Sequence, residues 1–225
     1  MKHTLFTLML FLTGLSNAQT VTIGTQVWMT KNLDVSTFRN GDPIPEAKSN
    51  EEWEKAGENK QPAWCYYDND PANGAKYGKL YNWYAVNDPR GLAPIEYHIP
   101  SDAEWTKLLD NLGSNSLKKM KSTSGWNRDF GKTVLIYDRN GILKKEVNKT
   151  RNGNGTNRSG FSGIPGGGRN GDGSFRDVGY EGEWWSSTEI ATHYARHYVL
   201  GTRLLLIGMT EAKKERGLSV RCIKD

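Results

Sequence analysis

The chain has 225 residues, 36% of them hydrophobic, and its 30 Lys or Arg against 25 Asp or Glu give a formal net charge of +5. A chain of this length buries a sizeable core, and its eight Trp, ten Tyr and six Phe favour a packed domain over a disordered chain. The 25 Gly do not recur at every third position, which excludes a collagen-like chain.

The N-terminus has the pattern of a secretory signal peptide. Lys2 precedes an apolar run at residues 5–15, and the segment ends at Ala18. The run is too short to span a bilayer of about 30 Å as a helix. No Cys stands at the expected cleavage point, which favours soluble export over a lipid anchor. We therefore expect a signal peptide at 1–18 and one exported domain at 19–225. The exported domain would be periplasmic or extracellular, and association with the cell surface is a further option.

Export changes the meaning of the two cysteines, Cys65 and Cys222. In an oxidising compartment they can form a disulfide, which would tie the end of the chain to its middle and stabilise it by about 5 kcal/mol in the chain-entropy model. The alternative is a pair of buried free thiols that pack as small apolar groups. The spacing fits no zinc site.

Positive charge is concentrated in residues 118–151, which hold ten Lys or Arg against three Asp or Glu. Such a segment either attracts a polyanionic glycan or an acidic surface, in a salt-sensitive way, or is an ordinary solvated face. The chain has no nucleic-acid-binding motif, so we do not expect nucleic acid as a partner.

In the first half of the chain, alternating apolar residues at 20–30, interrupted by Gly24, predict a strand or tight hairpin. Ser49 and Glu52 have the spacing of a capping box and predict a short helix that carries Trp53 and stops at Gly57.

Residues 75–87 have helical spacing of their apolar side chains, with Asn73 as the expected cap and Pro89 as the stop. A second capping box, Ser101 with Glu104, predicts a helix that ends at Gly113. The apolar positions in these two predicted helices are Tyr77, Leu80, Tyr81, Tyr84, Ala85, Trp105, Leu108, Leu109 and Leu112.

The second half of the chain is richer in strands and turns. Two apolar-rich runs flank the Asn140-Gly141 turn signal and predict a hairpin between Val134 and Val147. Residues 151–182 contain 11 Gly and predict a long irregular loop, without the Lys and hydroxyl residue that a phosphate-binding loop needs. Strands are expected at 183–189 and 196–200, and the alternation of Leu218, Val220 and Cys222 predicts a last strand.

Several motifs in the chain carry a family resemblance: Ile23–Met29, Asn32-Leu33, Tyr77–Ala85, Ile99–Trp105, Gly160–Ser162, Trp185–Glu189 and Gly217–Cys222. Together they resemble the Fibrobacter succinogenes major paralogous domain family, which is similar in turn to the C-type-lectin-like fold and, distantly, to formylglycine-generating enzymes. The resemblance implies a single α+β domain with paired terminal strands, two or three short helices and a long Gly-rich loop region.

The sequence argues against catalysis. Formylglycine-generating enzymes bind copper through two neighbouring cysteines, whereas Cys222 has no partner within its strand. His193 and His197 lack the HExxH glutamate and would lie about 13 Å apart along a strand, and His98 is remote from both in the sequence. There is no GxSxG nucleophile elbow. We expect a protein that is not an enzyme and has no cofactor.

A binding function draws on aromatic and polar side chains that loops present to a sugar. Trp184 and Trp185 are adjacent and point to opposite faces of a strand, so one of them is expected in the core. Trp185 lies within the family motif, which favours a structural role for it. Trp184 is therefore the best ligand-binding candidate, with Glu183, Glu189 and Arg169 beside it.

Calcium is a weaker hypothesis. Asp68, Asp70 and Asn73 offer hard oxygen ligands, but the EF-hand spacing is missing and a helix-entry turn explains these residues better. The Glu-Pro-Asn and Trp-Asn-Asp signatures of sugar-binding C-type lectins are missing too.

The sequence thus predicts a non-catalytic exported module that recognises a glycan or another envelope or extracellular component through its loop face. One alternative is an adhesion or structural surface protein that binds protein through the basic hairpin. Another is an enzyme distantly related to formylglycine-generating enzymes that lacks their cysteine pair.

Overall fold

A computed structural model describes residues 19–137, 143–204 and 207–225, with the backbone alone at 129–137 and 143–151. The expected signal peptide and the Asn140-Gly141 turn lie outside the described residues. The helices are α1 (Asn50–Glu58), α2 (Pro71–Tyr77), α3 (Trp83–Val86), α4 (Asp102–Leu112) and α5 (Ser116–Met120), with a 3₁₀ turn, η1, at Tyr67–Asn69. The strands are β1 (Thr20–Ile23), β2 (Gln26–Met29), β3 (Trp64–Cys65), β4 (Leu80–Tyr81), β5 (Tyr97–His98), β6 (Asp129–Tyr137), β7 (Leu143–Arg151), β8 (Gly168–Arg169), β9 (Phe175–Arg176), β10 (Glu181–Ala191), β11 (Tyr194–Gly201), β12 (Gly208–Lys213) and β13 (Ile223–Lys224).

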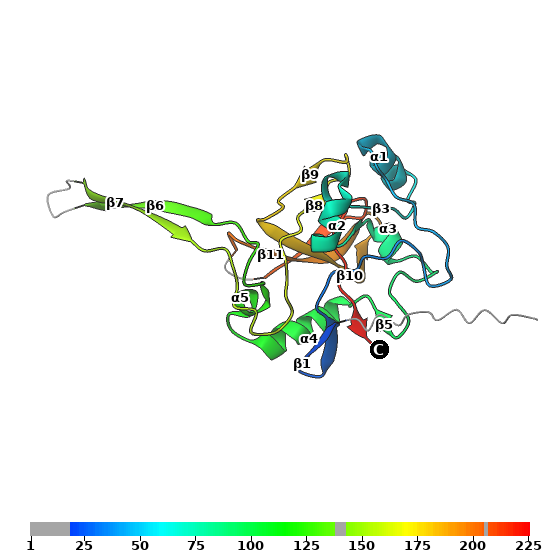
Figure 1. Ribbon diagram of the computed structural model, residues 1–225, viewed down its shortest axis with the longest axis horizontal. Coiled ribbons are helices and arrows are strands. Elements are labelled where there is room, and N and C mark those ends of the chain that lie inside the picture. Colours follow the sequence, from blue (N-terminus) through cyan, green and yellow to red (C-terminus); the bar gives the residue numbers. More distant parts are fainter. Residues whose placement is uncertain (1–18, 138–142, 205–206) are drawn as a thin grey trace, which may run out of the picture.

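The architecture is α+β, as predicted, with more helices in the described residues than the expected two or three. The strands form small antiparallel sheets with the orders β1-β2-β13-β5 and β10-β11-β12, together with the pairs β3-β4, β6-β7 and β8-β9. The predicted β6-β7 hairpin is present, with Val134 opposite Val147, and it extends away from the body of the domain (Figure 1). Within the described part of the chain, no helix is long and apolar enough to cross a membrane.

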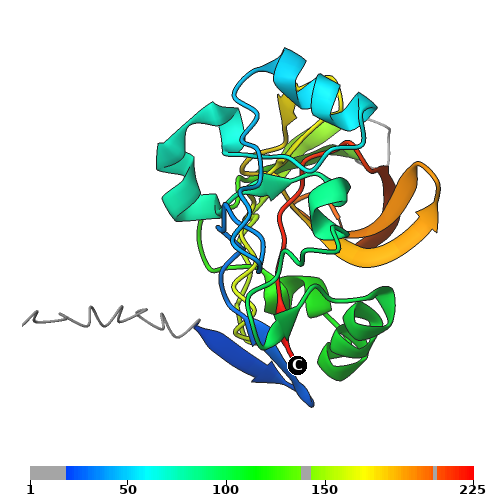
Figure 2. The same cartoon turned by 90° about the vertical axis from the view of Figure 1, so that its right-hand side faces the viewer.

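The two ends of the chain meet in one sheet. Ile223 of β13 pairs with Trp28 of β2 on one side and with His98 of β5 on the other. The N-terminal hairpin and the C-terminal strand therefore lie side by side (Figure 2). The expected pairing of terminal strands is present, with β2 rather than β1 as the partner of the last strand.

The two capping boxes form as predicted. The Ser49 hydroxyl caps α1 and the Ser101 hydroxyl caps α4, and in each case the Glu three residues later bonds back to the cap. Gly57 lies inside α1, which continues to Glu58. Helix α4 ends before Gly113, whose φ of 59° favours glycine.

The predicted continuous helix at 75–87 is wrong. The segment divides into the end of α2, strand β4 and the short helix α3, capped by Asp70 and Asn82 rather than by Asn73. Gly78 breaks the helix because its φ is 73° and a Cβ there would lie 2.8 Å from the carbonyl oxygen of Leu33.

The core consists of three clusters of buried apolar residues. Trp184 belongs to one cluster and Trp185 to another, so strand β10 is covered on both faces. The alternation expected near the C-terminus does not produce a regular strand there. Gly217, Leu218 and Ser219 instead form isolated bridges to three different elements, β8, β4 and β10, and the last strand covers Ile223–Lys224.

Candidate functional site

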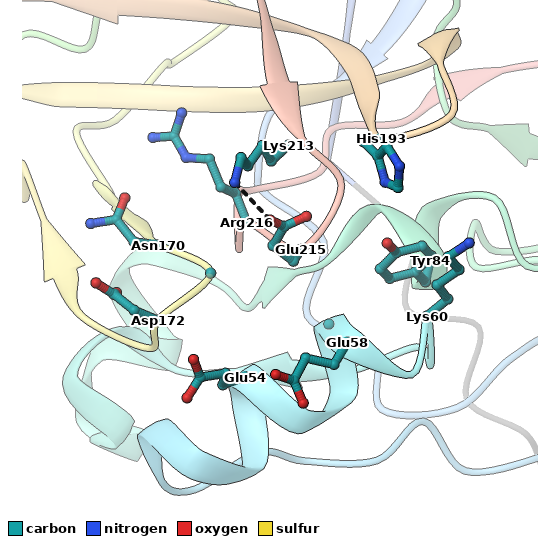
Figure 3. A pocket seen from close by; sticks show the side chains of 12 residues that line it. Glu54, Glu58, Lys60, Tyr84, Asn170, Asp172, His193, Lys213, Glu215 and Arg216 are labelled. Atoms are coloured by element: carbon teal, nitrogen blue, oxygen red, sulfur yellow. Dashed lines mark ion pairs between the residues drawn. The ribbon is translucent and has the colours of Figure 1, made fainter.

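A polar pocket of about 610 Å³ lies between helix α1, helix α3, the turn between β8 and β9, the turn between β10 and β11, and the segment that follows β12 (Figure 3). Charged residues of both signs dominate its lining, and Tyr84 is the aromatic side chain among them. The lining residues are Glu54, Gly57, Glu58, Lys60, Tyr84, Asn170, Gly171, Asp172, His193, Lys213, Glu215 and Arg216.

Two glycines bring the walls of this pocket together around Glu215. A Cβ at Gly57 would lie 2.7 Å from the Cβ of Glu215, and a Cβ at Gly171 would lie 2.6 Å from its Cγ. The indole N–H of the buried Trp53 donates to the carbonyl oxygen of Glu215 at 3.0 Å. These contacts fix helix α1 and the β8-β9 turn against the segment after β12.

Tyr84 is half-buried on the edge of the pocket. Burial raises the pKa of its hydroxyl group, and the neighbouring carboxylate of Glu215 raises it further. The phenol therefore stays protonated at neutral pH and can donate a hydrogen bond, while its ring offers an apolar face.

Arg169, one of the predicted ligand-binding residues, is fully buried and is not among the residues that line the pocket. Its guanidinium group donates to the carbonyl oxygens of Ala47, Ser49 and Gly173 at 2.8–3.0 Å and lies over the Trp53 ring. The direct ligand role is wrong for this side chain. Arg169 instead ties the start of α1 to the β8-β9 turn.

Glu183 is buried as well, with 1% of its surface exposed. It accepts two short hydrogen bonds from Arg176, lies 3.3 Å from Nε2 of His197 and lies 3.5 Å from Nη2 of Arg216. Burial alone raises the pKa of a carboxyl group, but the contacts with His197 and Arg176 outweigh it and hold the pKa of Glu183 below its ordinary value. Glu183 therefore does not face a ligand, and its charge supports Arg216 at the pocket wall.

The prediction that Trp184 is exposed is wrong. Trp184 and Trp185 are both fully buried, because each face of β10 packs against its own apolar cluster. The Trp184 N–H donates to Oδ1 of Asn32 at 2.8 Å, and the same oxygen accepts from the buried guanidinium group of Arg221. Trp184 is thus part of the core and cannot stack on a ligand.

Glu189 is the exposed member of the predicted set, with 52% of its side chain accessible. It forms an ion pair with Lys214 and is not among the lining residues of the pocket. The structure therefore does not bring the four predicted ligand-binding residues together at one exposed site.

The residues considered for calcium have roles at the entry to α2. Asp70 accepts from the Ala72 amide as the N-cap, Asn73 donates from its side chain to the Tyr67 carbonyl, and Asp68 lies in the 3₁₀ turn before the helix. No group of three or more His, Cys, Asp or Glu suited to a metal is found in the described ranges.

The disulfide hypothesis is wrong in this structure. Cys65 and Cys222 are both free and buried, in two different apolar clusters. Burial raises the pKa of each thiol to about 12, so both stay protonated and pack as small apolar groups.

The three histidines of the described residues occupy separate environments. His193 lines the pocket, and His197 is buried beside Glu183. His98 lies between two carboxylates, with its Nδ1 at 2.6 Å from Asp225 and its Nε2 at 2.7 Å from Glu104. Burial lowers the pKa of His98, but these two hydrogen bonds outweigh it and raise the pKa above its ordinary value. Both ring nitrogens are engaged, so His98 does not offer a free base to a serine.

Sequence reasoning missed the residues that line the pocket. They come from segments far apart in the chain and share no motif, and the closest approaches at Gly57 and Gly171 are visible only once the chain is folded.

Fold and site together define a small α+β domain with a polar surface pocket. The chain belongs to the Fibrobacter succinogenes major domain family, whose model matches residues 21–224. The resemblance seen in the sequence motifs is thereby confirmed. No curated protein and no solved structure matches the chain.

Proposed function

We propose that the protein is an exported, non-catalytic module that recognises a glycan or another component of the cell envelope through the pocket beside α1. The observation that carries the proposal is the lining itself, which surrounds one half-buried aromatic ring with hydrogen-bonding groups of both signs. Sugars need this combination, because their hydroxyl groups donate and accept while their C–H faces stack on aromatic rings.

The individual groups suit these roles. Glu54 and Glu58 are exposed on α1 and form no hydrogen bond or ion pair with other described residues, so their carboxylates are available to accept from sugar hydroxyls. Lys60 and Asn170 supply donors, and Tyr84 supplies the stacking surface. The lining contains no Ser, Thr or Cys, which favours binding over nucleophilic catalysis by those groups.

The arrangement of the chain also supports a C-type-lectin-like scaffold, in which joined terminal strands hold loops at the far side of the domain. Strands β2 and β13 supply the joined ends. The Gly-rich segment contributes Asn170, Gly171 and Asp172 to the pocket. The proposal thus keeps the expectation that a loop of the Gly-rich segment contacts the ligand, but it assigns that contact to different side chains.

The test is retention of residues 19–225 on immobilised bacterial and plant polysaccharides, with Tyr84→Ala and Glu58→Gln as site variants. Their controls are Tyr97→Ala, on β5, and Glu51→Gln, on α1 but outside the pocket lining. We expect the site variants to lose retention and the controls to keep it. Retention that survives both site variants would refute this site, and sugar chains shortened after incubation would favour the enzyme alternative.

A second candidate function rests on the β6-β7 hairpin. This hairpin forms a sheet of its own and extends from the body of the domain (Figure 1), in the segment where the sequence is most basic. In an adhesion or structural role, the hairpin would bind an acidic surface of a partner protein. Replacement of residues 130–150 by a short Gly-Ser turn would then abolish salt-sensitive protein binding and leave polysaccharide retention unchanged.

A further inference from the structure

Most of the charged side chains in the pocket are segregated by sign; the exceptions are Lys60, which follows α1, and Glu215, which lies between Lys213 and Arg216 in the chain. Glu54 and Glu58 lie on α1 with Asp172 near them on the β8-β9 turn, and Figure 3 shows this acidic wall facing a basic one. The basic wall carries Lys213, the last residue of β12, and Arg216, which follows that strand, with His193 beside them from the β10-β11 turn.

The two walls do not neutralise each other. The ion pairs of the basic wall are with other carboxylates: Lys213 lies 3.6 Å from Glu215 and Arg216 lies 3.5 Å from the buried Glu183. In the described part of the chain, Glu54 and Glu58 have no cation within ion-pair distance. Opposite charges thus face each other across a cavity of about 610 Å³ without contact.

Arg216 has unused donor capacity. Its contact with Glu183 is an ion pair at 3.5 Å, and its guanidinium group makes no hydrogen bond with the described residues. Its Nε is buried, so the terminal N–H groups are the donors that a ligand could reach. A guanidinium group in that state favours a carboxylate, which can accept two parallel hydrogen bonds from it.

We propose that the pocket selects a zwitterionic ligand, namely a sugar that carries both an amino group and a carboxylate. The amino group lies at the acidic wall, against Glu54 and Glu58, and the carboxylate lies at the basic wall, against Lys213 and Arg216. The inference rests on the proposed function and narrows it to a ligand class. A sugar with one charge gains less, because only one of the two walls then faces a group of opposite charge.

The test compares four monosaccharides by calorimetry at low salt: glucose, glucosamine, glucuronic acid and muramic acid, a glucosamine with a lactyl carboxylate. At partly exposed ion pairs, each charge contributes about twofold to fivefold in affinity. We expect muramic acid to bind about tenfold more tightly than glucose, with glucosamine and glucuronic acid within about threefold of glucose. Added salt should weaken muramic acid binding most.

Charge-neutralising variants assign the two walls. Glu58→Gln should remove the advantage of the amino group, and Lys213→Gln should remove the advantage of the carboxylate, each measured relative to the affinity of the same variant for glucose. The controls Glu51→Gln and Lys107→Gln change charge at exposed positions outside the pocket lining and should leave all four affinities as they are.

Two results would overturn the proposal, and only one of them would also overturn the proposed function. Equal affinity for all four sugars, with Tyr84→Ala weakening each of them, would remove the zwitterion inference and leave glycan recognition standing. No binding of any of the four sugars, or of any polysaccharide, would remove the inference and the proposed function together.

Discussion

The buried guanidinium group of Arg221 predicts a large stability loss on replacement by Met, which keeps a long apolar side chain. Arg221 donates to the carbonyl oxygens of Met29 and Phe161 at 3.0 and 2.6 Å and to Oδ1 of Asn32 at 2.7 Å. Asn32 keeps a second donor, the Trp184 indole, so the substitution leaves two buried carbonyl oxygens without this partner. At about 1–3 kcal/mol for each orphaned acceptor the loss is about 2–6 kcal/mol, and relief from burying a cation returns part of it.

We therefore expect Arg221→Met to lower the free energy of unfolding by about 2–4 kcal/mol, measured by urea denaturation with tryptophan fluorescence. Arg221→Lys keeps the charge but cannot reach all the acceptors at once, so its loss should be smaller. Arg158→Met, at an exposed position, is the matched control and should change stability by less than about 0.5 kcal/mol. An Arg221→Met chain that unfolds at the same urea concentration as the parent would refute the reasoning.

Three further predictions concern pH, backbone geometry and the thiols. Because the pKa of His98 is raised in the folded chain, its stabilising contribution is complete below its ordinary pKa of about 6.5 and is lost as the pH rises through the folded value. The stability difference between the parent and His98→Asn should shrink over that window, and a constant difference in urea titrations would contradict it. Gly167→Ala, whose Cβ would lie 2.3 Å from a main-chain oxygen, should destabilise by about 2 kcal/mol more than Gly113→Ala, which has similar φ and open space around it; equal melting temperatures would count against this. Cys65 and Cys222 should both resist a thiol reagent in the native chain and both react after unfolding without reductant, whereas a disulfide would leave neither reactive.

Features with local physical causes could be predicted from the sequence. The capping boxes at Ser49 and Ser101 act within one helical turn, and both helices begin where that signal places them. The N-terminal hairpin and the β6-β7 hairpin follow from alternation and turn residues within a few positions.

Features that depend on contacts between distant residues could not be predicted from the sequence. The spacing of Tyr77, Leu80 and Tyr81 matches one face of a helix, but their burial comes from packing in separate elements on either side of Gly78. Trp184 is buried in an apolar cluster built from distant segments, and Asn32, 152 positions away, supplies the acceptor for its N–H. Alternation along a strand identifies two faces and does not reveal that both are covered.

The pocket is the extreme case of such non-local structure. Glu58, Asp172 and Arg216 belong to three segments whose spacing in the sequence carries no signal, since exposed charged residues are common on any domain. The Gly-rich segment indicated where a recognition loop would lie, but the side chains that face the cavity depend on how Glu215 fits between Gly57 and Gly171.

The position of β13 has a consequence for how the protein is made. This strand lies inside its sheet, between β2 and β5, so the sheet cannot assemble until residue 224 has been synthesised. Until then the nascent chain lacks the strand that connects β2 to β5. Assembly of this sheet therefore follows synthesis of residues 20–224, and the N-terminal hairpin and β5 stay unconnected until then.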